Sequence, residues 1–279
     1  MSETASDRQL DLFAAAGDRA DVAPALPAAP ARRAPPAELG DDALLEQIRR
    51  ASIADCHVLA TEAGRRRLSA AIPVLEDLCR RFRGFGLRRA IPEQLAALEG
   101  LALIGGIAAA RTVARMITEH VMQGPGLAVA AEAAVRLGVR LPPECALALL
   151  RDPEPRVRAA ACRCARSSPD VATVMIELLG DLHVEVSRAA ACALGRVGRP
   201  EARPILLRLL CQDPSAEIID AAASLGDEEC LALLGRIGRA RPDLADAALA
   251  ALGDIEEPRA TAIAESVRRS WSSYPHLPR

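Results

Sequence analysis

The sequence predicts an all-α protein in which pairs of helices stack into a solenoid. The apolar content is 51%, yet the 279 residues include only one Trp, one Tyr and three Phe. Apolar side chains that are nearly all Ala, Leu, Val and Ile favour thin layers of closely packed helices over a thick β-sandwich core. Apolar residues also recur at helical spacing, and the second half of the chain repeats a motif about every 30 residues.

Residues 1–40 are predicted to form a disordered tail. Residues 14–40 are rich in Ala and Pro, and proline disfavours both helix interiors and sheet pairing. The prolines of this linker are Pro24, Pro27, Pro30, Pro35 and Pro36. We expect the short apolar segment before the linker to be carried as a peptide separate from the folded part.

Residues 41–124 are predicted to form divergent helix pairs of the same solenoid. Order is expected to begin at Asp41 or Asp42, either of which would suit the N-cap of a helix over 43–60. Gly and Pro separate the later apolar segments, which lack the alternation of β-branched residues typical of strands. Further helices are expected over 67–82, 91–104, 106–121 and 127–137.

Residues 125–270 repeat themselves, which is the strongest architectural signal in the sequence. Each unit contains an Asp, and successive Asp residues lie 29, 32 and 30 residues apart. This interval accommodates two short antiparallel helices with their turns, and we expect the Asp to cap the first helix of each pair. The four residues are Asp152, Asp181, Asp213 and Asp243.

Small residues follow the Asp in each unit, and small side chains let neighbouring helices approach closely. The alanine runs lie at 159–161, 189–191, 221–223 and 247–248. A Leu-Gly pair is expected to end the first helix of a repeat. These pairs lie at 137–138, 194–195, 225–226 and 252–253. One helix pair cannot bury its apolar face alone, so the units are predicted to stack.

Over about residues 125–265, these units resemble the HEAT-like repeats first grouped with phycobilisome lyases. The resemblance implies an α-solenoid. In that family an Asp and an Arg six residues later commonly bridge adjacent repeats, and Asp152 with Arg158 match this pattern. Ser187 and Ile219 occupy the equivalent Arg positions in the next two repeats, so we expect an incomplete ladder.

The segment 271–279 is expected to be a C-terminal tail. It contains Trp271 and Tyr274, and the terminal unit of a solenoid needs cover for its exposed apolar layer. We therefore expect these two residues to form an aromatic lid over the last repeat rather than a binding motif.

The N-terminal tail carries the pentapeptide QLDLF. A segment too short to fold leaves its large apolar residues in water, docks them on its own domain or carries them to a partner. The pentapeptide resembles the consensus by which bacterial replication and repair proteins bind the sliding clamp of DNA polymerase. The resemblance implies partner binding by Gln9, Leu10, Asp11, Leu12 and Phe13. The alternatives are that these residues pin the tail to the solenoid, or that the match is accidental.

A run of arginines between residues 65 and 89 is the second candidate site, for contact with phosphate or DNA. Helix ends could place several of these guanidinium groups on one face. They are Arg65, Arg66, Arg67, Arg80, Arg81, Arg83, Arg88 and Arg89. A solvated face of an Arg-rich protein is the favoured interpretation, so DNA is the weaker of the expected partners. Gly84 and Gly86 lack a phosphate-loop pattern around them and are expected to form a turn between helices.

Catalytic arrangements are poorly supported, so we expect no catalytic residues, no metal and no cofactor. The sequence contains no Lys, which excludes a phosphate-loop lysine and a Schiff-base lysine. The four His residues lie far apart, and neither C-x-x-C nor H-x-x-x-H spacing occurs. The eight Cys lie mostly within helical patterns, where a free thiol behaves as a small core residue, and they indicate a reducing compartment.

The formal net charge of −2 excludes a global field that would draw the protein onto nucleic acid or an anionic membrane. No apolar run approaches membrane-spanning length, so a cytoplasmic protein without a membrane partner is expected. The sequence thus predicts a noncatalytic adaptor that is recruited to the sliding clamp and presents its solenoid to another protein. The alternatives are a general interaction scaffold, and an enzyme related to the bilin lyases or alkylbase DNA glycosylases of similar fold.

Overall fold

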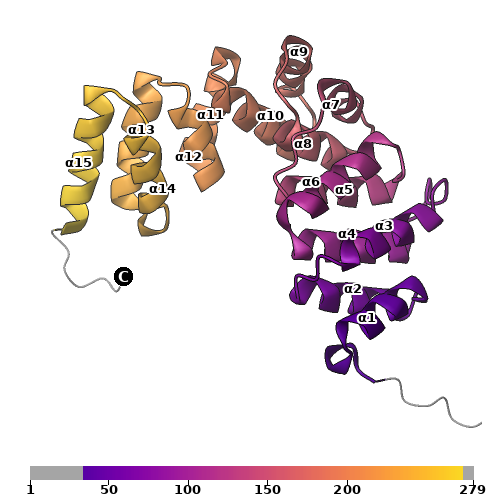
Figure 1. Cartoon of the computed structure of the whole chain (residues 1–279). Helices are drawn as coiled ribbons and strands as arrows, with labels where there is room; N and C mark the ends of the chain where they lie inside the picture. Colours follow the sequence, from indigo (N-terminus) through magenta and orange to yellow (C-terminus); the bar gives the residue numbers. More distant parts are fainter. Residues whose placement is uncertain (1–33, 273–279) are drawn as a thin grey trace, which may run out of the picture. The chain divides into compact units, whose positions relative to one another are not determined.

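The structure is a computed structural model that describes residues 34–272 (Figure 1). The chain divides into two units, residues 1–38 and 39–279. In the first unit the described residues include one 3₁₀ turn, η1 (Pro36–Glu38), within the segment predicted to be disordered. In the described part of the second unit every regular element is a helix, so the all-α prediction is confirmed.

The helices of the second unit follow one another with short connections. They are α1 (Asp41–Arg49), α2 (Cys56–Arg65), α3 (Ala71–Arg81), α4 (Pro92–Ile104), α5 (Gly106–Thr118), α6 (Pro125–Arg136), α7 (Pro143–Leu150), α8 (Pro155–Cys164), α9 (Pro169–Leu178), α10 (Val184–Arg196), η2 (Pro200–Ala202), α11 (Arg203–Gln212), α12 (Ala216–Ala223), α13 (Glu228–Ala240), α14 (Pro242–Gly253) and α15 (Pro258–Ser272). None of the helices within residues 34–272 has the length and apolar character needed to cross a membrane.

The α-helices form two rows. The first, which we call row A, contains α2, α4, α6, α8, α10, α12 and α14, and each of these helices contacts the next (Figure 1). The second, row B, contains the odd-numbered helices, with contacts that join α1 to α3, α3 to α5, α7 to α9, α11 to α13 and α13 to α15. A single hydrophobic core runs through the stacked pairs from Leu44 to Ala264. The predicted α-solenoid is therefore confirmed.

Small residues let the row A helices approach one another. The alanine runs at 159–161, 189–191 and 221–223 are buried. Gly195 of α10 lies directly against α12, since a Cβ atom on it would stand 2.7 Å from the carbonyl oxygen of Ala221. The predicted role of the alanine runs in close helix packing is thus supported.

The prediction that the pair 194–195 ends its helix is wrong. α10 continues to Arg196, and the glycine that follows its end is Gly198, with a φ of +69°. Gly138 and Gly226, with φ of +65° and +64°, follow the ends of α6 and α12 as predicted. Gly195 is therefore small because α12 packs against it, although its sequence context resembles that of a helix end.

The repeated Asp residues do not cap the helices as predicted. Asp152 and Asp181 each lie two residues before the N-cap position, where Oδ1 accepts a hydrogen bond from the backbone N–H two residues later, at 2.9 and 2.8 Å. Asp213 follows the end of α11, and Asp243 lies in the first turn of α14. The first two residues therefore organise the turn that precedes a row A helix.

Arginine links successive repeats more regularly than predicted. Arg158 of α8 donates from Nε and Nη2 to the two carboxylate oxygens of Asp181, at 2.9 and 3.0 Å. Ser187 occupies the next expected Arg position, but its neighbour Arg188 donates from Nη1 to Oδ2 of Asp213 at 2.7 Å. The ladder continues into the third repeat with a shift of one residue.

The predicted helix over 43–60 is two helices, α1 and α2, separated by residues 50–55. α1 begins at Asp41, and Gly40 holds the N-cap position, so the prediction of an Asp N-cap is wrong. Asp41 and Asp42 both lie in the first turn of α1, where their negative charge interacts favourably with the helix dipole.

The last helix, α15, covers the end of the solenoid. Trp271 near its end donates from Nε1 to the carbonyl oxygen of Gly238 in α13, at 2.8 Å. The half-buried indole agrees with the lid expected of it. Tyr274 lies outside the described residues.

Gly195→Ala is expected to lower the free energy of unfolding by about 1 to 3 kcal/mol, because the added methyl group would overlap the backbone of α12. Urea unfolding followed by circular dichroism measures the change. Gly253→Ala is the matched control, because a Cβ there meets no neighbouring atom within 4 Å, and its effect should stay within about 0.5 kcal/mol. Equal losses in the two variants would contradict the close approach of α10 and α12.

Arg158→Ala is expected to lower the free energy of unfolding by about 3 kcal/mol, because it leaves the carboxylate of Asp181 without its cationic partner and that side chain is only 8% exposed. Arg188→Ala should cost less than about 1 kcal/mol, because the side chain of Asp213 is 71% exposed and water replaces the lost partner. The free energy of unfolding at neutral pH ranks the two variants. A larger loss of stability for Arg188→Ala would show that the buried pair Arg158–Asp181 does not contribute more than the exposed pair Arg188–Asp213.

Candidate functional site

The clamp-like pentapeptide lies outside the described residues, so the roles of Gln9–Phe13 stay a prediction. These residues belong to the first unit of the chain, residues 1–38. The candidate sites that the structure describes are surfaces of the solenoid.

The run of arginines predicted as one site forms two separate groups. Arg66 donates to Oδ1 of Asp41 at 2.9 Å, at the start of α1. Arg81 donates to the carbonyl oxygen of Arg49 at 2.6 Å, at the end of α1. A helix of nine residues is about 13 Å long. The first three arginines and the remaining five therefore gather near opposite ends of α1, in two groups rather than one cluster.

Glu62 pairs with two of the three arginines of the first group. This residue is 8% exposed, and it accepts hydrogen bonds from Arg65, twice at 2.8 Å, and from Arg66 at 2.7 Å. The two guanidinium groups hold the pKa of Glu62 at about 2, well below its usual value. Arg67 has no side-chain partner among the described residues, so one of the three arginines is left for a ligand.

The second group is also partly committed within the protein. Arg80 lies 2.7 Å from Glu76 and 2.7 Å from Glu119, and Arg83 donates to a backbone carbonyl oxygen at 2.9 Å. Arg88 and Arg89 have no side-chain partner within residues 34–272. Arg88 and Arg89 thus remain for the solvated face that the sequence favoured, whereas Arg80 and Arg83 are engaged within the protein, and contact of this group with phosphate or DNA stays a prediction.

The turn between α3 and α4 exposes an apolar surface, which we call the α3–α4 patch. Gly84 and Gly86 have φ of +84° and +93° and form the turn between helices that was predicted. Phe85 and Leu87 beside them are 65% and 68% exposed. A cavity of about 550 Å³ adjoins the turn, and its lining includes Ile53, Phe82, Phe85, Ile91, Arg81 and Arg89. Exposed apolar residues that gather in this way are typical of interaction surfaces.

A second basic surface, which the sequence analysis missed, lies at the carboxyl ends of three consecutive row A helices. Each of α6, α8 and α10 has an Arg in its last turn, and another Arg follows three or four residues later. The available signal was the repeated spacing in RLGVR, RCAR and RVGR. We call the following five residues the arginine edge: Arg136, Arg140, Arg163, Arg166 and Arg196.

A backbone bridge holds two of these helix ends together. The N–H of Leu141 donates to the carbonyl oxygen of Cys164 at 2.7 Å, and the N–H of Arg166 donates to the carbonyl oxygen of Leu141 at 3.0 Å. Arg140 adds a bond from Nη1 to the carbonyl oxygen of Arg163, at 3.0 Å. Because Leu141 is fully buried, the loop after α6 is fixed against the loop after α8.

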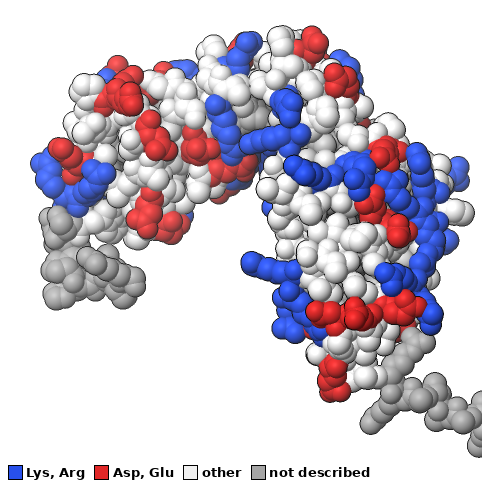
Figure 2. Space-filling model, viewed as in Figure 1, with Lys and Arg blue, Asp and Glu red and all other residues white. Residues whose placement is uncertain are grey.

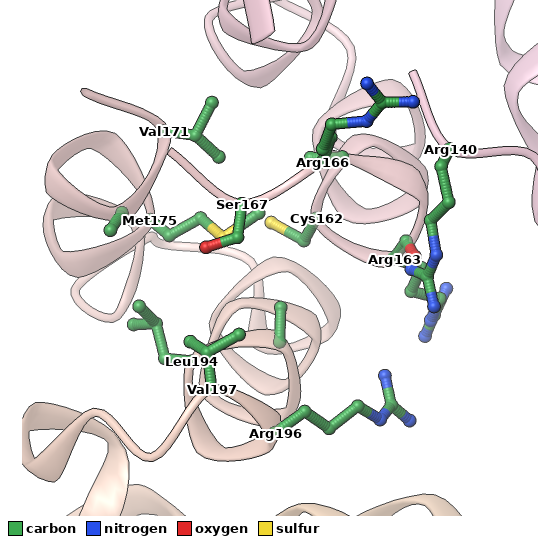
Figure 3. Close-up of a pocket in the computed structure, with 13 residues that line it drawn as sticks. Arg140, Cys162, Arg163, Arg166, Ser167, Val171, Met175, Leu194, Arg196 and Val197 are labelled. Atoms are coloured by element: carbon green, nitrogen blue, oxygen red, sulfur yellow. Dashed lines mark hydrogen bonds between the residues drawn. The ribbon is translucent and has the colours of Figure 1, made fainter. Parts of the chain in front are cut away.

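The arginine edge borders a cavity of about 390 Å³ between α8, α9 and α10. Figure 3 shows Val171 and Met175 of α9 on one side of this cavity and the arginine side chains on the other. In Figure 2, basic side chains gather over the part of the chain that contains α8 and α10. Among the described residues that line the cavity, none is Asp, Glu or His.

The charge of the arginine edge is only partly neutralised. Arg196 lies 2.9 Å from Asp220 and 3.4 Å from Glu217, and Arg163 lies 3.5 Å from Glu217. The side chains of Arg136 and Arg166 have no partner in the described part of the chain. The edge therefore carries positive charge that is available to a ligand.

Cys162 also lines this cavity, but burial raises the pKa of its thiol to about 12. Burial has the same effect on other core cysteines, because the charged thiolate is poorly solvated in an apolar interior. The pKa is raised to about 12 at Cys79, Cys164 and Cys230 and to about 11 at Cys192. Such thiols are protonated at neutral pH and are poor nucleophiles.

The histidines within residues 34–272 belong to no cluster of three or more potential metal ligands. Nδ1 of His57 lies 3.3 Å from a carboxylate oxygen of Glu99. The described residues contain no group of three or more His, Cys, Asp or Glu side chains that could hold a metal ion. His276 lies outside the described residues, and the expected lack of a metal, a cofactor and catalytic residues stays a prediction.

Comparison with known proteins agrees with the repeat architecture. Residues 143–226, which contain α7 to α12, match the family model described as HEAT repeats, so the HEAT-like prediction is confirmed for this part of the chain. No curated protein matches the chain. Among solved structures, the Escherichia coli protein YibA is similar with a TM-score of 0.46 and 15% identity, over 84% of this chain and 94% of that chain.

Human deoxyhypusine hydroxylase, solved in complex with glycerol, is similar with a TM-score of 0.29 and 21% identity. The likeness covers 85% of this chain and 88% of the human protein. Structural likenesses as weak as these two say nothing about function.

Glu62 should make stability depend on pH in the acid range. Its pKa is about 2 in the folded protein and 4.5 as an ordinary carboxyl, so its contribution is complete above pH 4.5 and is lost as the pH falls toward 2. We expect Glu62→Gln to melt below the wild type at pH 7, by a difference that shrinks over this interval. Melting temperatures followed by circular dichroism measure it.

The double variant Arg65→Gln/Arg66→Gln is the control for this pH dependence. It removes the two donors that depress the pKa of Glu62, so adding Glu62→Gln to it should change the melting temperature by a similar amount at every pH. If the melting temperatures of the wild type and Glu62→Gln differ by the same amount from pH 7 to pH 2, the pKa assigned to Glu62 is contradicted.

Proposed function

We propose that the protein is a noncatalytic helical-repeat adaptor of DNA replication or repair. The pentapeptide Gln9–Phe13 recruits it to the sliding clamp of a bacterial DNA polymerase, and the solenoid holds another protein. DNA contact through the arginines is a minor contribution, and the proposal includes neither a cofactor nor a membrane partner.

The chemistry of the cavity at the arginine edge carries the adaptor proposal. Its titratable groups are guanidinium groups, which stay charged in proteins, and the thiol of Cys162, which burial keeps protonated. Acid-base catalysis needs a group that exchanges protons near neutral pH. Apolar walls with fixed positive charges are instead suited to recognition.

The α3–α4 patch supports the same proposal from another part of the solenoid. Phe85 and Leu87 are large, exposed and close to Arg88 and Arg89. A monomeric protein rarely leaves such residues together in water without a binding role. The solenoid therefore offers two surfaces with the composition of protein-binding sites.

The clamp proposal rests on the pentapeptide, in which all five positions match the consensus. Burial of Leu10, Leu12 and Phe13 would contribute roughly 5 to 8 kcal/mol. Ordering of the peptide would offset about 2 to 5 kcal/mol of this. The resulting contact is weak and transient, which suits a tether better than a permanent subunit.

Surface plasmon resonance with purified bacterial clamp tests the recruitment. We expect the full chain to bind in the micromolar range or weaker and Leu12→Ala/Phe13→Ala to weaken binding by at least about tenfold, because the two largest apolar contacts are lost. Arg136→Glu/Arg166→Glu is the control, since it changes the solenoid surface and leaves the pentapeptide intact.

Equal binding by the wild type and by Leu12→Ala/Phe13→Ala would refute recruitment by the pentapeptide. The solenoid surfaces would then support the second function, a general protein-interaction scaffold unrelated to replication. That function predicts that a chain without residues 1–33 retains every partner of the full chain.

A further inference from the structure

Two cavities meet at Arg140. The first is the cavity of about 390 Å³ between α8, α9 and α10. The second, of about 610 Å³, lies between the turn from α4 to α5 and the loop after α6. Arg140 lines both cavities and is held by its bond to the carbonyl oxygen of Arg163. The two cavities are therefore consecutive parts of one surface along the arginine edge.

The walls of both cavities are largely apolar. Ile107, at the start of α5, is 73% exposed, and Val197, after the end of α10, is 49% exposed. The other large apolar residues of the walls are Leu137, Val139, Val171, Met175 and Leu194. Each cavity has room for at least one Leu-sized or Phe-sized side chain, and burying one there would release water from the walls.

Positive charge lines both cavities without a negative group in their walls. The second cavity adds Arg111 and Arg136 to the arginines of the first. Neither wall contains Asp or Glu among the described residues. The side chains of Arg111, Arg136 and Arg166 have no partner within residues 34–272. Each of these guanidinium groups can bind a carboxylate through paired N–H donors.

We infer that this surface docks an acidic peptide segment that also carries bulky apolar side chains. The partnerless guanidinium groups select Asp or Glu, and the cavity walls select Leu, Ile, Met or Phe next to them. Single-stranded nucleic acid fits less well, because the described residues that line the cavities include no aromatic side chain to stack on a base. The inference rests on the proposed adaptor role of the solenoid and is independent of clamp recruitment.

Random peptides displayed on phage and selected on the full chain test this inference. We expect the enriched peptides to place Asp or Glu beside Leu, Ile, Met or Phe. The best of them, labelled with fluorescein, is then used to measure affinity by anisotropy. An unlabelled DNA duplex serves as the competitor that represents nucleic acid.

Charge variants locate the site. Arg136→Glu/Arg166→Glu reverses two partnerless charges without removing an internal contact, and it should weaken peptide binding by at least about tenfold. Arg208→Glu/Arg236→Glu makes the same change of charge at two exposed arginines of α11 and α13 that have no side-chain partner within residues 34–272 and line neither cavity. It should weaken binding by less than about threefold.

Apolar variants test the walls in the same way. Val197→Asp, in the wall of the first cavity, should weaken binding by at least about tenfold. Val184→Asp is the control, because Val184 is an exposed apolar residue at the opposite end of α10. Its affinity for the peptide should match that of the wild type.

Several results would overturn the inference. They are a failure to enrich any peptide, enrichment of basic or uncharged peptides, equal losses in the two charge variants, and displacement of the peptide by duplex DNA at lower concentration than by unlabelled peptide. Tighter peptide binding after deletion of residues 1–33 would make the chain's own tail the occupant, which also overturns it. The clamp measurement depends on residues 9–13 and the peptide measurement on the arginine edge, so either proposal can fail while the other stands.

Discussion

The close approach of the row A helices is the constraint on which the rest of the solenoid depends. Gly195 brings the backbone of α10 against α12, and Gly100 does the same for α4 against α2, where a Cβ would stand 3.0 Å from the carbonyl oxygen of Ala60. Buried alanine runs extend this packing along the row. A chain with so few aromatic residues cannot fill wide gaps between helices, so small residues are what give it native packing density.

The same packing brings equivalent positions of successive repeats within reach of one side chain. Arg158 reaches the carboxylate of Asp181 for this reason, and Arg136, Arg163 and Arg196 recur at the ends of adjacent helices. A helix dipole favours one cation at each carboxyl end, which explains the last-turn arginines without any ligand. The dipole does not explain Arg140 and Arg166, which follow the ends of α6 and α8, or the walls without carboxylates, and the proposed role in binding would explain both. Arg199, the corresponding residue after α10, pairs with Glu201 instead.

The fold class and the repeat could be predicted because helical periodicity and a regular interval are properties of the sequence pattern itself. The predictions that were wrong concern residues whose roles depend on which neighbours they meet in the folded chain. Gly195 looks like a helix end, yet it is small because α12 lies against it, and Arg188 continues a ladder that Ser187 had seemed to break. The arginines of residues 65–89 are close in sequence but lie at two ends of α1, whereas Arg140 and Arg163 are 23 residues apart and meet through their loops. The repeated Arg spacing was visible in the sequence, but its meaning depended on knowing where the helices end.

The central claim is that the carboxyl ends of α6, α8 and α10 form the surface by which the solenoid holds a partner. Hydrogen–deuterium exchange of the full chain, with and without a saturating acidic and apolar peptide, tests this claim most directly. The expected result is slower exchange within residues 136–141, 163–168 and 194–199, with no change at the α3–α4 patch. Protection centred on residues 83–90, or spread evenly over the described helices, would contradict it.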